Sequence, residues 1–222
     1  MKIVSIIPAR GGSKGIPNKN IKDINGQPLI SYNIEASIKS NIDETWISTD
    51  DDVISNISSK YGAKVLKRPE YLADDNASSD DVLLHFAENV EFDILVFLQC
   101  TSPLTTFEDI NGAIKLLNTC EFDSVLSVCD NHGGWLCGGF TWEIIGKQAS
   151  PDYDINNRPR RQDCTPSFRE NGAIYVTTRD ALLKSKCRIS GDIGLYIMPR
   201  QRSFEIDEPE DLIEIRKYLN VK

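Results

Sequence analysis

The chain has 222 residues, 40% of them hydrophobic, with 25 Lys and Arg against 33 Asp and Glu and a net charge of −8. This size suits one α/β domain with a sizeable core. The negative charge argues against a general nucleic-acid binder, whose affinity depends on neutralising phosphates. No stretch approaches the roughly 20 apolar residues of a membrane span. The first apolar run starts at Ile3, so we expect no signal peptide and a cytoplasmic protein.

The six cysteines form no C-x-x-C pair, and several lie inside apolar runs. We therefore expect buried free thiols in a reducing cytosol. The only histidines are His85 and His132. Two histidines argue against a histidine-built zinc site and against a Ser-His-Asp triad.

The first element is an apolar run at residues 3–7, which ends at Pro8 and is too short for a helix, so it predicts a buried strand. The loop that follows carries three glycines and three cations: Gly11, Gly12, Gly15, Arg10, Lys14 and Lys19. Glycines let backbone N–H groups approach phosphate oxygens closely, and the cations add full positive charge. The loop therefore predicts a polyphosphate site, with a basic surface turn as the alternative.

Two familiar phosphate loops do not fit this stretch. A Walker loop needs Gly-Lys followed by Ser or Thr, whereas here Lys14 precedes Gly15. The dinucleotide fingerprint runs straight from G-x-G-x-x-G into a helix, whereas here two glycines are adjacent and Pro17 prolongs the loop. The loop therefore belongs to another class of nucleotide site.

Strands and helices then alternate along the chain. We expect strands at 44–49, 64–66, 93–98 and 123–128, and helices at 28–40, from Ser78 or Ser79 to 89, and at 107–118. This alternation predicts a mostly parallel sheet. Ligands in such sheets bind beyond the carboxyl ends of strands, so the loops after the first, third and fourth strands should converge on one site.

Three aspartates, at 50–52, close the strand at 44–49. We expect Asp50 to cap the helix that follows, because Asp is a favoured N-cap residue. The alternative is a metal motif of the D-x-D type, which would indicate a glycosyltransferase that uses a nucleotide sugar.

Residues 130–168 break the alternation with paired glycines, two tryptophans and the basic cluster 158–161. Apolar and aromatic residues on such an excursion suggest a partner surface. The chain then returns with expected strands at 171–176 and 194–197 and helices at 179–185 and 209–219. We therefore expect one domain, 1–222, with an inserted segment at 130–168.

Glu205 and Asp207 lie two residues apart just before the last expected helix. In an extended segment such residues share a face. Mg²⁺ usually takes one or two carboxylates together with substrate phosphates, so the pair suggests a Mg²⁺ (or Mn²⁺) site. The alternative is an acidic segment that only caps the helix.

Residues 7–20, Ile-Pro-Ala-Arg-Gly-Gly-Ser-Lys-Gly-Ile-Pro-Asn-Lys-Asn, resemble the signature of the acylneuraminate cytidylyltransferases, a family of sugar nucleotidyltransferases. Further segments that resemble the family are 67–69 with 77–79, 98–104, 161–163 and 168–175. The resemblance implies a Rossmann-like nucleotidyltransferase fold, a three-layer α/β sandwich with a mostly parallel central sheet. It also implies transfer of CMP from CTP to a nonulosonic acid, and a homodimer formed by residues 130–168, called the arm below.

The resemblance also assigns roles to particular residues. Those implied to bind the nucleotide are Ala9, Arg10, Gly11, Gly12, Ser13, Lys14, Lys19, Asn20, Arg68 and Ser79. Those implied to bind the sugar are Gln99, Arg161, Arg169, Asn171 and Tyr175. Metal binding falls to Glu205 and Asp207, and catalysis to Arg10, Lys14, Lys19 and Asp207. Taken alone, Arg68 is an ordinary surface arginine and Arg161 a solvated charge or an inter-subunit ion pair.

The chain departs from the family pattern at several positions. Glu205 stands where the family has Asp, Cys100 where it has Pro, and Thr105 where it has Arg. Sialate-using members carry paired phenylalanines where this chain has Arg188-Ile189. The sugar could therefore be of the sialic, legionaminic or pseudaminic acid type. A nucleotide-sugar glycosyltransferase and a catalytically silent nucleotide-binding protein remain the alternatives.

Overall fold

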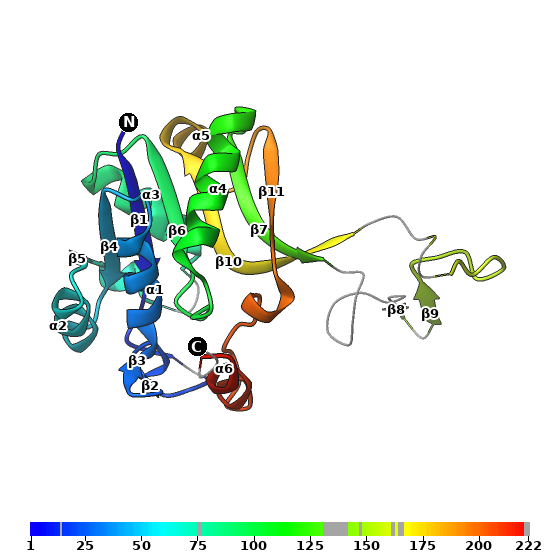
Figure 1. Cartoon of the computed structure of the whole chain (residues 1–222), viewed down its shortest axis with the longest axis horizontal. Helices are drawn as coiled ribbons and strands as arrows, with labels where there is room; N and C mark the ends of the chain where they lie inside the picture. The colour runs from blue at the N-terminus through cyan, green and yellow to red at the C-terminus, as the bar shows by residue number, and fades with distance from the viewer. Residues whose placement is uncertain are drawn as a thin grey trace.

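The structure is a computed structural model that describes residues 1–13, 15–74, 77–130, 142–146, 148–160, 163 and 167–219. Among these residues, no helix combines the length and the apolar character that crossing a bilayer requires. The described chain is built on a seven-stranded sheet with helices on both faces (Figure 1).

The sheet has the strand order β11-β7-β10-β6-β1-β4-β5. Its strands are β1 (Ile3–Pro8), β4 (Glu44–Thr49), β5 (Lys64–Lys67), β6 (Ile94–Leu98), β7 (Ser124–Asp130), β10 (Phe168–Thr178) and β11 (Ile193–Met198). Neighbouring strands are parallel, except that β10 runs antiparallel to both β6 and β7. The predicted mostly parallel sheet is confirmed. The strand order reverses at β1, and such a switch point is where α/β sheets bind ligands.

Two apolar clusters fill the two faces of the sheet. The first cluster includes residues of α1 (Leu29–Lys39), α4 (Phe107–Cys120), α2 (Asp52–Lys60) and α6 (Asp211–Leu219). The second includes residues of α3 (Ser79–Asn89) and α5 (Arg179–Ser185). Figure 1 shows α1 and α4 side by side over one face. In β6, Ile94 and Val96 join the first cluster and Leu95 the second, as the two-residue period of a buried strand requires.

Most predicted elements appear within three residues of their expected ends, but two details were wrong. The N-cap of α2 is Asp51, whose side chain accepts hydrogen bonds from Val53 N and Ile54 N. Asp50 instead accepts from Gly11 N at 3.1 Å. The last helix begins at Asp211 rather than Pro209, and the Asp211 carboxylate accepts from the backbone N–H groups of Asp207 and Glu208, which precede the helix.

Several short elements had no clear pattern in the sequence. These are β2 (Asp23–Ile24), β3 (Gln27–Pro28), η1 (Lys19–Ile21), η2 (Glu70–Leu72) and η4 (Arg200–Arg202). Residues 203–207 have no regular secondary structure. The expectation of buried thiols holds for Cys100 and Cys129 but is wrong for Cys120, which is exposed at the end of α4.

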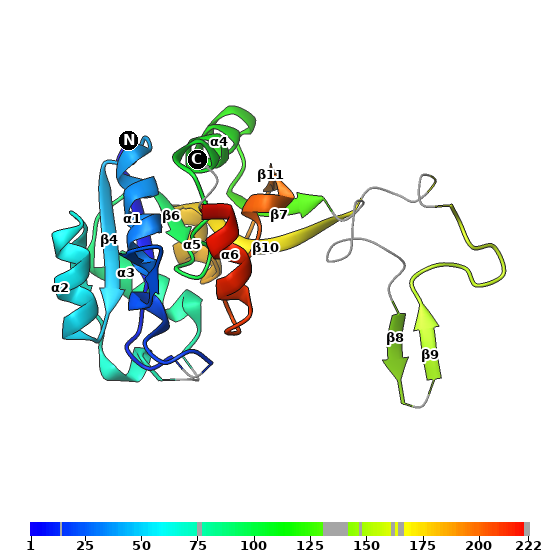
Figure 2. The same cartoon turned by 60° about the horizontal axis from the view of Figure 1, so that its bottom comes forward.

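β7 ends at Asp130 and β10 begins at Phe168, where the arm was expected to start and end. The described part of the arm includes a hairpin of β8 (Trp142–Ile145) and β9 (Gln148–Pro151). This hairpin stands away from the sheet in both views (Figure 2). An isolated two-stranded hairpin is marginally stable. The predicted dimer contact is not tested here and stays a prediction.

Candidate functional site

A cleft of about 500 Å³ opens at the carboxyl ends of β1 and β5. We call it the first cleft. Six residues expected to bind a nucleotide line it: Arg10, Ser13, Lys19, Asn20, Arg68 and Ser79. Asp207 and Glu208 close one side. The structure therefore brings the loop after β1, the segment after β5 and the acidic segment near the carboxyl terminus to one place.

Hydrogen bonds to two other segments hold the start of the loop after β1 in place. Ala9 is buried and its N–H donates to Ser48 O at 2.9 Å, which continues the β1–β4 pairing. The Arg10 guanidinium donates to Asp74 O at 2.9 Å across the cleft. Gly11 packs so tightly that an added Cβ would lie 2.8 Å from an oxygen of Asp51. A glycine at this position therefore allows the backbone of the loop to pass close to Asp51.

Lys19 connects this loop to a segment almost two hundred residues away. Its Nζ donates to Ile206 O at 2.9 Å and contacts Asp207 Oδ1 at 3.2 Å. Asn20 is buried, and its amide donates to Arg10 O at 2.9 Å. Lys19, which was expected to bind phosphate, therefore lies beside Asp207, which was expected to bind the metal.

Arg68 is buried rather than a surface arginine, with 6% of its surface exposed. Its guanidinium donates to Ser48 O at 2.8 Å, Ser48 Oγ at 3.2 Å and Leu72 O at 3.3 Å. Burial lowers the pKa of Arg68 to about 10, so it stays charged at neutral pH. The side chain fixes the floor of the first cleft and contributes positive charge there.

A second cleft, of about 260 Å³, adjoins the first. Charged and amide side chains line much of it: Arg169, Glu170, Asn171, Arg200, Glu205 and Asp207. Asp207 lines both clefts. Ile206 is fully buried between the two carboxylates, so Glu205 and Asp207 share the exposed side of their segment.

Glu205 lies in a confined position. Burial raises the pKa of Glu205 to about 7, and the negative charge of nearby Asp207 is the second cause. Gln99, directly after β6, donates from Nε2 to Glu205 Oε1 at 3.1 Å. Gly172, at φ +69°, leaves the room for this carboxyl group, since an added Cβ would clash with Glu205 Oε1. The loops after β1 and β5 line the first cleft, and the loop after β6 contacts Glu205 in the second, so the three expected loops meet around the two adjoining clefts.

The residues at this join fit a divalent cation shared with a phosphate ligand. Glu205 and Asp207 oppose each other electrostatically, and a cation would offset that repulsion. Among the described residues there is no group of three or more His, Cys, Asp or Glu that could form a complete cage. Mg²⁺ commonly takes one or two carboxylates and completes its coordination with water and phosphate.

Comparison with known proteins agrees with this geometry. The family model described as cytidylyltransferase matches residues 4–149, well over half of the chain. The chain belongs to the cytidylyltransferase family. This confirms the family assignment based on residues 7–20.

Curated relatives with this family's chemistry in their names match most of the chain. N-acylneuraminate cytidylyltransferase B of Danio rerio is 37% identical over 91% of this chain and 48% of its own length. An N-acylneuraminate cytidylyltransferase of Streptococcus agalactiae serotype III (strain NEM316) is 32% identical over 99% of this chain and 54% of its own length. The chain thus spans about half the length of these relatives.

Solved structures share the fold. A CMP:2-keto-3-deoxy-manno-octonic acid synthetase complexed with CTP superposes with a TM-score of 0.73 at 20% identity, covering 99% of this chain and 98% of the other. A 4-diphosphocytidyl-2C-methyl-D-erythritol synthase from Anaerococcus prevotii DSM 20548 superposes with a TM-score of 0.67 at 13% identity, covering 98% of each chain. The expected α/β nucleotidyltransferase fold is confirmed.

Two residues expected to bind sugar have internal hydrogen-bond partners in this chain. The Asn171 amide donates to Ser203 Oγ at 2.9 Å, and its oxygen accepts from Ser127 Oγ at 2.6 Å. The buried Tyr175 hydroxyl donates to Glu170 Oε1. Both side chains support the wall of the second cleft.

Lys14 and Arg161 lie outside the described residues of this family member. The three aspartates at 50–52 have separate partners: Gly11 N for Asp50, the α2 backbone for Asp51 and Lys67 Nζ, at 2.6 Å, for Asp52. This arrangement gives no support to a D-x-D metal site at residues 50–52.

Arg200 and Asp74 line the clefts but had no signal in the sequence. Arg200 begins the short 3-10 helix η4, and Asp74 lies in the irregular segment after η2. The Gly172–Glu205 contact had a partial signal, because an Asn-Gly pair inside an expected strand suggests a close approach of another group.

Proposed function

We propose that this chain is a CMP-nonulosonate synthetase, which transfers CMP from CTP to the C2 hydroxyl of a nonulosonic acid and releases pyrophosphate. The observation that carries the proposal is that the two clefts meet at Asp207. A nucleotide in the first cleft and a sugar acid in the second would place their reacting ends at this residue. The names of the curated relatives support the same reaction class.

The first cleft suits the triphosphate of CTP. Arg10 and Lys19 supply positive charge on one wall, and the amino end of α3, where Ser79 is the first helical residue, lies on another. Both features favour phosphate oxygens. Arg10 and Lys19, together with Lys14, would stabilise the negative charge of the departing pyrophosphate.

The second cleft suits the carboxylate of a nonulosonic acid. Arg169 and Arg200 both line it. An arginine fork matches a carboxylate better than lysine does. Arg161, expected from the sequence to contribute here, remains part of the proposal.

The reaction needs no covalent enzyme intermediate. The sugar hydroxyl attacks the α-phosphorus in line, so this chain contributes by orienting both substrates and by stabilising charge. Lys19 holds its ammonium against Asp207, and Gln99 holds Glu205. Glu205 and Asp207 would bind Mg²⁺ or Mn²⁺, which offsets charge on the α-phosphate and lowers the pKa of the attacking hydroxyl.

We further propose that the enzyme acts in the cytoplasm as a homodimer through the arm. The β8–β9 hairpin supports this, because it stands away from the sheet and leaves Ile144 largely exposed (Figure 2). Sedimentation equilibrium of the protein, with and without residues 131–166, would decide the oligomeric state.

Pyrophosphate release tests the reaction directly. CTP and Mg²⁺ would be incubated with sialic, legionaminic or pseudaminic acid, and with a CMP-sugar donor as the glycosyltransferase alternative. We expect pyrophosphate with at least one free sugar acid and no release of CMP from the CMP-sugar. Release of CMP from the CMP-sugar, with no pyrophosphate from CTP, would favour the glycosyltransferase. Binding of CTP with neither pyrophosphate nor CMP released in any mixture would favour a silent nucleotide-binding protein.

Two substitutions test the assigned residues. We expect Arg10→Ala and Asp207→Ala each to lower kcat/KM by about a hundredfold or more, because they remove charge stabilisation at the reacting phosphates. Asp52→Ala is the matched control, since it removes an exposed carboxylate whose ion-pair partner among the described residues is the exposed Lys67. Steady-state assays should find it near wild type. Near-normal turnover of either test variant would remove its assigned role.

A further inference from the structure

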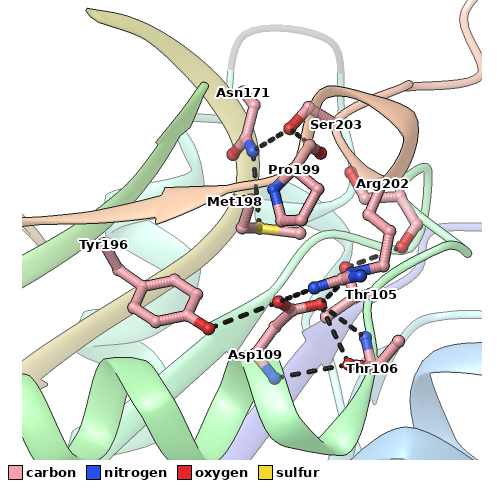
Figure 3. A network of polar contacts seen from close by, with 10 residues as sticks. Thr105, Thr106, Asp109, Asn171, Tyr196, Met198, Pro199, Arg202 and Ser203 are labelled. Carbon is pink, nitrogen blue, oxygen red and sulfur yellow. Dashed lines mark hydrogen bonds and ion pairs between the residues drawn. The ribbon is translucent and has the colours of Figure 1, made fainter. Parts of the chain in front are cut away.

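Asp109 is a fully buried carboxylate in the first turn of α4, outside both clefts. It accepts hydrogen bonds from Arg202 Nε and Nη2, both at 2.8 Å, and from Tyr196 OH at 3.4 Å (Figure 3). It also accepts from the backbone N–H and the hydroxyl of Thr106, at 3.1 and 3.0 Å, which completes the capping box of α4. One carboxylate thus joins α4, β11 and η4.

The geometry of this ion pair is specific. A buried carboxylate is costly unless it is paired and fully hydrogen-bonded. The two parallel bonds from Arg202 require the planar guanidinium fork, which lysine cannot reproduce. Thr106 Oγ1 still accepts from Asp109 N without Arg202, so the amino end of α4 keeps part of its cap.

Arg202 ends η4, and only two residues separate it from Glu205. Ser203 is held by Asn171 Nδ2 at 2.9 Å (Figure 3). Ile206 N donates to Thr101 O at 2.9 Å. The irregular segment that carries the two carboxylates has no strand or helix to define it. Its position depends on these bonds, on the contacts of Lys19 with Ile206 O and of Gln99 with Glu205, and on the buried side chain of Ile206. Phe204 also stacks on Tyr218 of α6.

We propose that Asp109 and Arg202 form a positioning pair that sets where the segment 203–207 lies, and so where Glu205 and Asp207 stand at the join of the clefts. The predicted effect on catalysis rests on the proposed function, whereas the predicted effect on the position of segment 203–207 does not. Neither Asp109 nor Arg202 lines either cleft, so the pair acts through the segment that begins at Ser203.

The test variant is Arg202→Lys, which keeps the charge and loses the fork. Arg179→Lys is the matched control. Arg179 also holds two acceptors with its guanidinium, Ala87 O at 2.7 Å and Val90 O at 3.0 Å, but it does so at the carboxyl end of α3. Loss of the Arg179 hydrogen bonds should lower the stability of the fold without moving the segment 203–207.

Hydrogen exchange measures the segment directly, independent of activity. We expect the peptide that covers residues 203–207 to exchange at least tenfold faster in Arg202→Lys than in wild type. The same peptide should be unchanged in Arg179→Lys. Titration with Mn²⁺ in the presence of CTP, followed by electron paramagnetic resonance, should show at least threefold weaker binding in Arg202→Lys only.

Kinetics then separate positioning from general damage. We expect kcat to fall at least tenfold in Arg202→Lys while the KM for CTP changes less than threefold, because the first cleft keeps its other walls. Unchanged exchange at 203–207, or the same increase in both variants, would overturn the proposal. If wild type turns over no nonulosonic acid, the proposed function fails and the exchange data still decide the positioning role.

Arg202→Gln is the second variant and would be measured in the same way. Retained circular dichroism with faster exchange at 203–207 supports the proposal. Loss of the folded state in both Arg202 variants overturns it, because the pair would then hold the whole sheet rather than this segment.

Discussion

Gly172 shows how much the site depends on a missing side chain. Its φ of +69° lies in the left-handed region, and an added Cβ would clash with Glu205 Oε1 and lie 2.9 Å from Glu205 Cδ. Gly172→Ala would therefore displace the carboxyl group from Gln99. We expect kcat to fall by about tenfold, an order of magnitude for a misplaced group at a reacting centre, with about 1 kcal/mol of stability lost to backbone strain.

Gly26→Ala separates the two effects of that substitution. Gly26 has a φ of +86° and nothing within 4 Å of an added Cβ. The control therefore carries similar backbone strain without a clash at the site. Urea unfolding should show comparable losses for both variants, and pyrophosphate-release kinetics should show a loss of kcat for Gly172→Ala alone. Equal kcat values would mean that Glu205 is not held by this contact.

At the scale of elements, the amino end of α3 combines a cap with a cleft wall. Ser78 caps the helix by accepting from Asp81 N at 3.0 Å, and Ser79 starts it at the edge of the first cleft. Without the cap, the first turn would fray and its N–H groups would no longer be aligned with the cleft. We expect Ser78→Ala to lose about 1 kcal/mol of stability and to raise the KM for CTP severalfold.

Thr178→Ala is the control for this helix end. Thr178 caps α5 by accepting from Ala181 N at 3.2 Å. It is the last residue of β10, at the end of the sheet away from the clefts. Thermal unfolding should show a similar loss for both cap variants. Michaelis–Menten analysis should find the KM for CTP changed only in Ser78→Ala. A raised KM in both variants would indicate general loosening instead.

Elements with strong local signals could be predicted from the sequence. The apolar run of β6 and the capping residues of α3 and α4 carry their own information, and both helices formed within two residues of expectation. The Asp50 prediction failed because three adjacent aspartates offer equal caps, and only the position of Gly11 N decides which one turns toward the loop. Local propensity cannot resolve such a choice.

The part of the site formed by the glycine-rich motif could be predicted from the sequence. The parts formed where distant segments meet could not. The glycine-rich loop identified one wall of the first cleft. The contacts of Lys19 with Ile206 and Asp207, and of Gln99 with Glu205, join residues more than a hundred positions apart. They depend on the strand order, which places β1 beside β6, and on the segment 203–207, which contacts residues that follow both strands. No periodicity within a single stretch contains that information.

For the whole molecule, charge is organised differently at the two ends of the sheet. The clefts occupy the carboxyl ends of the parallel strands. At the opposite end, Glu44 pairs with Lys64 at 2.8 Å and with Lys2 at 3.3 Å, which ties β1, β4 and β5 together. The bond to Lys64, followed by the Trp46 indole N–H and Lys2, lowers the pKa of Glu44 to about 2. This end of the sheet is therefore sensitive to acid independently of the site.

Glu44→Gln tests that sensitivity. The pKa of Glu44 falls from 4.5 to about 2 on folding, so its contribution is complete above pH 4.5 and disappears as the pH falls toward 2. Because both lysines are about half exposed, we expect about 1 kcal/mol at pH 7. Urea unfolding of wild type and variant should differ by that amount at pH 7, by progressively less below pH 4.5, and should converge only below about pH 2. CTP turnover at pH 7 should be unchanged, since the substitution is at the far end of the sheet. A difference that stays the same between pH 4.5 and pH 2 would show that the carboxylate charge is not the cause.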